Sequence, residues 1–249
     1  MGRKSGESRE AGLPRPDDAA RGACYHSLMD ERPKIISCEV LRDEIERVNP
    51  DYEIDFVEGA LHDYPDKLRA RLQERIDATA GDCPILLSCA RCSNGTVGLR
   101  GGDHRLVVPA TDDCISILLG SRARYLDEHG RHPGTYYYTR GWIDYIEDPY
   151  QEYLKMIPKY GEERAGQLER MILANYTRVA VIDTGTYDLE KLRDYLETAA
   201  SFYGLPIEYL PGSLRYLEKL VSGRHDDEFI VVEPGGELEE SRFWALAEA

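Results

Sequence analysis

The chain has 249 residues, and its 31 Lys and Arg residues against 46 Asp and Glu residues give a formal net charge of −15. This charge disfavours nucleic acid and anionic membranes as partners. No run of roughly 18 apolar residues and no signal-peptide core is present, so we expect a cytoplasmic protein. In that reducing compartment the six cysteines are expected to be free, metal-bound or catalytic rather than paired in disulfides.

Residues 1–32 mix Gly, Ser, Pro and both charges without a hydrophobic period. This composition predicts a disordered N-terminal extension ahead of a folded domain at 33–249. Met29 stands just before the first apolar run, which suggests that it is the natural start of the protein. Cys24 falls in the extension and is given no role.

From residue 34 onward, apolar β-rich runs alternate with helical patterns. Strands are predicted at 34–36, 52–57, 85–87, 105–108, 134–139, 178–182, 207–210 and 229–232, with helices between most of them. This order predicts an α/β fold, Rossmann-like, with a mostly parallel sheet covered by helices on both faces. The strands could form one continuous sheet or two similar lobes at about 33–140 and 177–236.

Three cysteines stand where predicted strands end. Cys38 follows the first strand, Cys92 lies in a Cys-Ser-Asn-Gly turn after the third, and Cys114 follows the fourth. Because parallel strands deliver their carboxyl ends to one edge of a sheet, these thiols are expected to converge. Helix caps are expected just before Cys38 and Cys114, which would place both thiols in first helical turns that favour thiolate.

The caps expected are Ser37 for the helix at Cys38, and Thr111 or Asp112 for the helix at Cys114. Three converging thiolates suit a zinc ion whose fourth position stays open for catalysis, with Glu39 or Asp113 as a neighbouring or exchangeable ligand. Iron would also fit.

Cys89, three residues before Cys92, offers a fourth sulfur. Four sulfurs would suit a closed structural site or an iron–sulfur cluster. Cys89 and Cys92 also form a CxxC motif, typical of redox pairs, although such motifs usually open a helix directly and here a turn intervenes. A lone Cys at a strand end is more often a small core residue, and packing is the expected role of Cys83. No HxxxH or HExxH motif points to a histidine-rich metal site.

Other candidate residues also follow strands. Asn94 and Gly95 form the turn beside Cys92, where glycine permits close approach to a ligand. Trp142 follows a Tyr-rich strand and could line a substrate site with its flat aromatic ring. Asp183 and Glu233 end later strands, where they either bind substrate or cap the next element.

Several motifs in this order resemble the uncharacterised DUF1638 family. They are 36–39 (ISCE), 92–95 (CSNG), 109–114 (PATDDC), 141–142 (GW) and the run 229–235. The resemblance implies that Cys38, Cys92 and Cys114 are the family's motif cysteines, whereas Cys89 stands where relatives usually carry another residue. It also implies an association with corrinoid-dependent methyl-transfer systems.

We therefore expect a zinc–thiolate protein of one-carbon or methyl-group metabolism, acting as a metal-dependent transferase or as an accessory protein. Its expected partners are a small-molecule substrate and a corrinoid protein or methyltransferase. The rival hypothesis is a noncatalytic module that binds a small molecule or a corrinoid protein while the cysteines only pack. An iron–sulfur protein is the third alternative.

Overall fold

The computed structural model describes residues 32–244 of the chain. Nearly all of the predicted N-terminal extension, with Met29 and Cys24, lies outside the described residues. No helix in this described range is long and apolar enough to cross a membrane.

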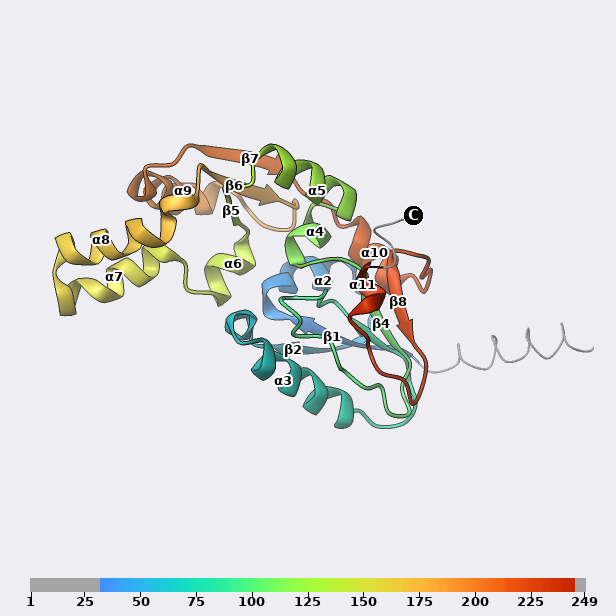
Figure 1. Ribbon diagram of the computed structural model, residues 1–249. Coiled ribbons are helices and arrows are strands. Elements are labelled where there is room, and N and C mark those ends of the chain that lie inside the picture. Colours follow the sequence, from blue (N-terminus) through green and yellow to red (C-terminus); the bar gives the residue numbers. More distant parts are fainter. Residues whose placement is uncertain (1–31, 245–249) are drawn as a thin grey trace, which may run out of the picture. The chain divides into compact units, whose positions relative to one another are not determined.

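The first sheet has five strands within the described range, in the order β2-β1-β3-β4-β8 (Figure 1). The strands are β1 (Lys34–Cys38), β2 (Glu53–Val57), β3 (Ile85–Leu87), β4 (Leu106–Pro109) and β8 (Phe229–Val232). Strands β1 to β4 pair in parallel, so their carboxyl ends share one edge of the sheet. Strand β8 runs antiparallel to β4, and its carboxyl end therefore lies at the opposite edge.

The second sheet, counted over the same described residues, has three parallel strands in the order β5-β6-β7. They are β5 (Thr135–Tyr138), β6 (Arg178–Asp183) and β7 (Ile207–Pro211). The chain enters this sheet after β4 and returns to the first sheet for β8. Each of the two sequence segments 33–140 and 177–236 consequently contributes strands to both sheets.

Helices, with η marking 3-10 helices, connect and cover the strands. They are η1 (Glu39–Leu41), α2 (Arg42–Val48), η2 (Gly59–Asp63), α3 (Pro65–Asp77), α4 (Cys114–Leu118), α5 (Arg122–Arg131), α6 (Arg140–Tyr145), α7 (Pro149–Tyr160), α8 (Glu162–Ile172), η3 (Leu173–Asn175), α9 (Glu190–Tyr203), α10 (Arg215–Val221) and α11 (Ser241–Trp244).

Local chemistry explains where the longer helices begin and end. Pro65 starts α3, where its fixed φ suits the first helical turn and its missing N–H costs nothing. Asp148 and Gln151 form a capping box at the start of α7, each side chain accepting a hydrogen bond from the other residue's main-chain N–H. Gly204 ends α9 in the left-handed conformation that glycine adopts without strain.

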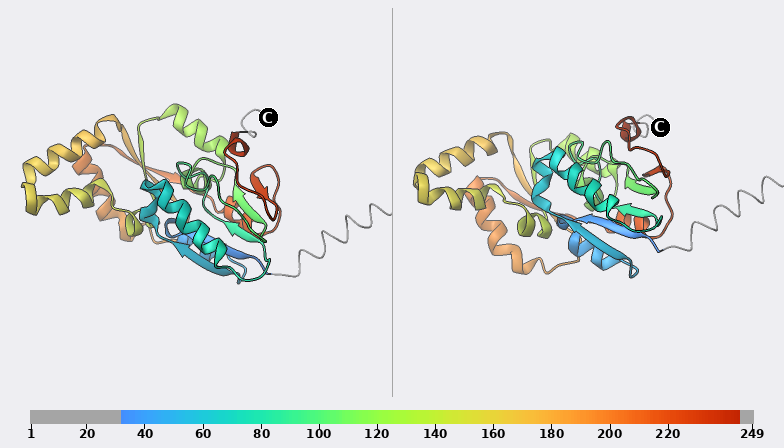
Figure 2. Two further views of the ribbon diagram at one scale, coloured as in Figure 1. Left: turned by 60° about the horizontal axis from the view of Figure 1, so that its bottom comes forward. Right: turned by 90° about the horizontal axis from the view of Figure 1, so that it is seen from below.

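The first sheet buries apolar side chains on both faces, as alternation along each strand requires. Ile35 and Leu86 belong to a core cluster that contains side chains of α2, α4 and α10. Their neighbours Ile36 and Leu87 belong to a second cluster, with the apolar stripe of α3. Figure 2 shows α2 and α3 on opposite sides of β1 and β2.

The predicted α/β fold is thus confirmed: the sheets are mostly parallel, helices and strands alternate, and the arrangement is Rossmann-like. Strand β8 is the antiparallel member of this mostly parallel sheet and fills the edge beside β4. A parallel β8 would need a crossover from one end of the sheet to the other, whereas here the chain reaches it directly from α10.

Candidate functional site

Four cysteines line one small cavity at the carboxyl edge of the first sheet. Cys38 is the last residue of β1, Cys89 and Cys92 follow β3, and Cys114 is the first residue of α4. The cavity has a volume of about 30 Å³, room for one or two water molecules or a single ion. Its remaining wall is formed by Val40, Leu41, Glu58, Gly59, His62, Leu68, Ser88, Trp142 and Ile146.

The turn that carries Cys92 has an unusual backbone. Cys92, Ser93 and Asn94 all have positive φ angles, of 45°, 53° and 70°, although none of them is glycine. Each such residue costs about 1 kcal/mol or more, and strain of this kind concentrates at functional sites. Main-chain bonds hold the turn in place, including one from Cys92 N to the carbonyl of Asp112 at 3.0 Å. The loops after β3 and β4 are thus joined through their main chains, which fixes the backbone of Cys92.

Gly95 completes this turn for a steric reason. A Cβ at this position would lie 2.6 Å from Cδ2 of Leu68 on α3. The turn packs directly on α3, and the predicted close approach at Gly95 is made by the protein's own helix. Asn94 is also used structurally, because its side chain accepts a hydrogen bond from Arg91 at 3.1 Å and donates one to Glu240 at 3.4 Å.

Burial keeps the four thiols protonated. It raises the pKa of Cys38 to about 11, although a main-chain hydrogen bond from Val40 acts in the opposite direction. Burial also raises the pKa of Cys89, Cys92 and Cys114, and repulsion between the sulfurs adds to the effect. At neutral pH the thiols are neutral unless a cation replaces their protons.

The expectation that helix dipoles favour thiolate at Cys38 and Cys114 was therefore wrong. Cys38 precedes the three-residue helix η1 in an extended conformation. Ser37 does not cap that helix, and instead its hydroxyl donates to the main-chain oxygen of Cys38 and accepts from Ser88. Such a short helix has a small dipole, and desolvation outweighs it.

Cys114 does lie in a first helical turn, but the cap is Asp113 rather than Thr111 or Asp112. The Asp113 carboxylate accepts a hydrogen bond from Ser116 N at 3.1 Å. Asp113 lines a separate, open pocket of about 320 Å³ instead of the cysteine cavity. Other residues of this open pocket are Arg91, Ser93, Asp112, Arg122, Tyr125, Leu126 and His129.

Trp142 is the one predicted substrate-binding residue that lines the cysteine cavity. Thr139 caps α6 by accepting a hydrogen bond from Trp142 N at 3.0 Å, which fixes the start of this short helix. The helix comes so close to η1 that a Cβ at Gly141 would lie 2.0 Å from the carbonyl oxygen of Val40. Glycine at 141 is thus required for Trp142 to reach the cavity.

Three further predicted residues lie elsewhere. Glu39 accepts a hydrogen bond from Gly59 N at 3.3 Å and does not line the cavity. Asp183 accepts from Gly185 N at 2.9 Å in the turn after β6, in the second sheet. Glu233 follows the antiparallel β8 and is therefore at the other edge of the first sheet, where it pairs with Arg105 at 3.0 Å.

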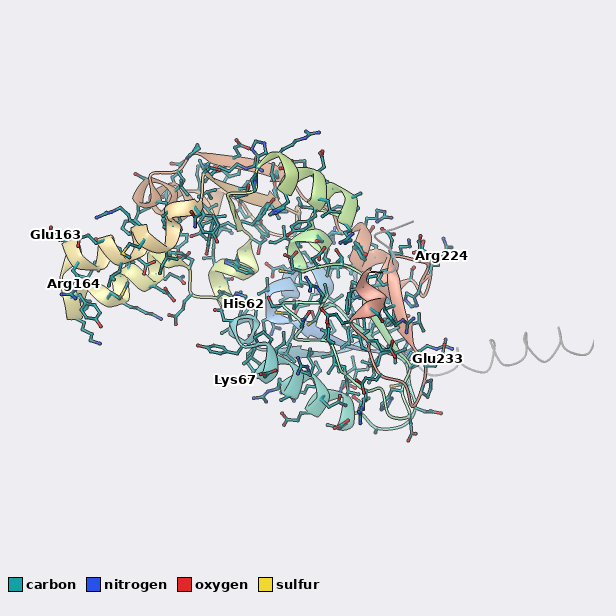
Figure 3. All side chains as sticks on the ribbon, viewed as in Figure 1. His62, Lys67, Glu163, Arg164, Arg224 and Glu233 are labelled. Carbon is teal, nitrogen blue, oxygen red and sulfur yellow. The ribbon has the colours of Figure 1, made fainter. Side chains whose placement is uncertain are left out.

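His62 was not among the residues expected at the site. It belongs to η2 (Figure 3) and lines the cavity. Its ring lies 4.9 Å from that of Trp142, measured between centroids. A signal was present, because η2 follows the second parallel strand and so belongs to the same edge as the cysteines. Among residues 32–244, no three His, Cys, Asp or Glu side chains already stand in an arrangement that could hold a metal ion.

A family model described as "Protein of unknown function (DUF1638)" matches residues 56–221, more than half of the chain. The chain belongs to the DUF1638 family. The DUF1638 match includes His62, Trp142 and the three cysteines that follow β3 and β4, while Cys38 lies upstream of it. Neither curated proteins nor solved structures include a match to the chain.

Proposed function

We propose that this DUF1638 protein is a metal–thiolate protein in which Cys38, Cys92 and Cys114 hold a zinc ion. The observation that carries the proposal is the convergence of cysteines from separate strand ends on one cavity of about 30 Å³. Three thiolates are a donor set that zinc prefers, and the volume suits a single ion. The side chains would have to turn inward, each losing its proton as it binds.

Main-chain hydrogen bonds support thiolate at this cavity. Val40 and Ala90 provide such bonds to the sulfurs of Cys38 and Cys92, and each lowers the pKa of its thiol. Hydrogen bonds to sulfur stabilise the thiolates of metal sites in the same way. The apolar wall, including Leu41 and Trp142, keeps bulk water away.

We propose that the protein uses this site in one-carbon or methyl-group metabolism in the cytoplasm, as a transferase or its accessory protein. When bound, zinc with an open position supplies a Lewis acid that holds a substrate thiol as thiolate at neutral pH. In this proposal the three cysteines hold the ion, and the indole of Trp142 bounds the space left for a small substrate. The proposed protein partner is a corrinoid protein or a methyltransferase.

The decisive experiment is zinc analysis of the full chain, purified under reducing conditions and given zinc. We expect one zinc per chain in the unaltered protein and a large loss in Cys92→Ser. Cys83→Ser is the matched control, because Cys83 does not line the cavity, and it should keep its zinc. Circular dichroism verifies that each variant is folded. Stoichiometric zinc in folded Cys92→Ser would refute the proposed ligand set.

A second candidate function is an iron–sulfur protein, which Cys89 favours because it adds a fourth sulfur to the cavity. The small cavity volume argues against it, since a cluster of two or more irons needs far more room than one ion. Anaerobic purification separates the candidates: a cluster gives brown protein with iron and sulfide, whereas a zinc–thiolate protein is colourless.

The third candidate, a noncatalytic binding module, is favoured by the open pocket of about 320 Å³ that contains Arg91, Asp112 and Arg122. This size is typical of small-molecule sites. Such a module needs no metal, so a chelator should leave the thiol reactivity of the native protein unchanged. In the zinc–thiolate proposal, a chelator releases the ion and changes the rate at which the thiols react.

A further inference from the structure

His62 lines the cysteine cavity and has an unpaired ring nitrogen. Its Nδ1 atom is buried and has no hydrogen-bond partner. The opposite ring nitrogen, Nε2, lies 3.0 Å from the carboxylate of Asp63, and the side chain as a whole is 32% exposed. The Nε2 edge of the imidazole therefore faces Asp63, whereas the Nδ1 edge is shielded from water. His62 is also one of the residues that line the cavity.

The carboxylate of Asp63 determines which nitrogen carries the proton. A carboxylate accepts hydrogen bonds, so in the neutral imidazole Nε2 holds the proton and Nδ1 keeps a lone pair. Contact with the ring of Trp142, at 4.9 Å between centroids, helps to fix the orientation of the imidazole. The result is a lone pair on a buried nitrogen that no protein donor satisfies, an arrangement that calls for an unseen partner.

We propose that Nδ1 of His62 is the fourth ligand of the metal site, giving zinc three sulfur ligands and one nitrogen ligand. This inference rests on the proposed zinc–thiolate function. It assigns Asp63 as the carboxylate that orients the ligating imidazole, a pairing that is common where histidine binds zinc. Sequence motifs do not indicate this role, because His62 belongs to no HxxxH or HExxH pattern.

Charge favours His62 over Cys89 as the fourth ligand. Three thiolates and Zn²⁺ carry a net charge of −1, and a fourth thiolate would make it −2, whereas a neutral imidazole adds none. The residues that line the cavity include no Lys or Arg to offset the second negative charge. Burying an uncompensated charge is costly, so the nitrogen ligand is preferred.

This assignment also gives His62 a part in the proposed reaction. Cys38, Cys92, Cys114 and His62 are all partly buried. His62 is the one neutral ligand of the proposed set, so it is the ligand that a negatively charged substrate thiolate would replace. The proton of the substrate thiol would pass to Nδ1 of the released His62 imidazole, so that charge and protons balance.

X-ray absorption at the zinc edge tests the ligand set directly in the zinc-loaded full chain. We expect about three sulfur atoms near 2.3 Å and one nitrogen near 2.0 Å from zinc. His62→Ala should lose the nitrogen component from histidine and bind zinc at least about tenfold more weakly. His132→Gln is the matched control, since His132 is exposed at the end of α5, and it should leave the spectrum unchanged.

The outcomes separate this inference from the function on which it rests. Four sulfur ligands in the unaltered protein would overturn the assignment of His62 while leaving a zinc–thiolate protein, with Cys89 as the fourth ligand. An unchanged spectrum and affinity in folded His62→Ala would overturn it as well. Absence of zinc from the unaltered, zinc-treated chain would refute the proposed function itself.

Discussion

Replacing Gly141 by alanine tests how the fold brings α6 to the cysteine cavity. The new Cβ would lie 2.0 Å from the carbonyl oxygen of Val40 and 2.6 Å from its carbonyl carbon. Both atoms belong to the main chain of η1, directly after Cys38, so neither can turn aside as a side chain can. Helix α6 would have to move by roughly 1 Å or more to relieve the contact.

Overpacking a tight contact lowers the free energy of unfolding by typically about 1–3 kcal/mol. Because the atoms that the new Cβ meets belong to the main chain, we expect Gly141→Ala to lie at or above the upper end of that range. For a chain of this size, a loss of about 3 kcal/mol corresponds to a fall of roughly 6–12 °C in the unfolding temperature. The displacement would also withdraw Trp142 from the cavity wall. We therefore expect weaker zinc binding in addition to lower stability.

Thermal and urea unfolding, followed by circular dichroism, measure the effect. Gly130→Ala is the matched control, because Gly130 is also helical but a Cβ there would meet no atom within 4 Å. That change should stabilise the protein by about 0.5–1 kcal/mol, as alanine usually does in a helix. If Gly141→Ala unfolds at the temperature of the unaltered protein, the close approach of α6 to η1 is not what requires glycine.

Two further predictions concern pH. The pKa of Cys38 is about 11 in the folded chain, against an ordinary value of 9.0. The protonated thiol therefore favours folding of the metal-free protein below about pH 9, and this contribution to stability is lost as the pH approaches about 11. Urea unfolding across this pH range should show the loss, and Cys38→Ala should make the loss smaller. Glu169 is buried with both carboxylate oxygens unpartnered, and burial raises its pKa from 4.5 to about 7. Its protonated form favours folding below about pH 4.5, and this contribution is lost as the pH rises through about 7. Glu169→Gln should therefore raise the unfolding temperature at about pH 8 and change it little at about pH 4.5, whereas an equal shift at both pH values would contradict this reasoning.

Local patterns were sufficient to predict the strands of the fold and several of its helices. The apolar runs at 85–87 and 229–232 coincide with β3 and β8, and the stripe of Leu68, Leu72 and Ile76 is the buried face of α3. Such patterns depend on a residue's near neighbours along the chain. The direction of a strand is not visible in such patterns, and only the pairing of β8 with β4 shows that it runs antiparallel. Glu233 lies at the opposite edge from the cysteines for that reason.

For the candidate site, the sequence by itself determined that thiols come directly after several strands of a parallel sheet, and the loops after parallel strands meet at one edge. Cys38, Cys92 and Cys114 could be grouped on that basis alone. The tertiary structure decided the rest, because burial and close contact arise between segments far apart in the chain. Only packing shows that desolvation raises the pKa of these thiols, that Gly141 meets the main chain of η1, and that His62, which lines the same cavity, has an unpaired nitrogen.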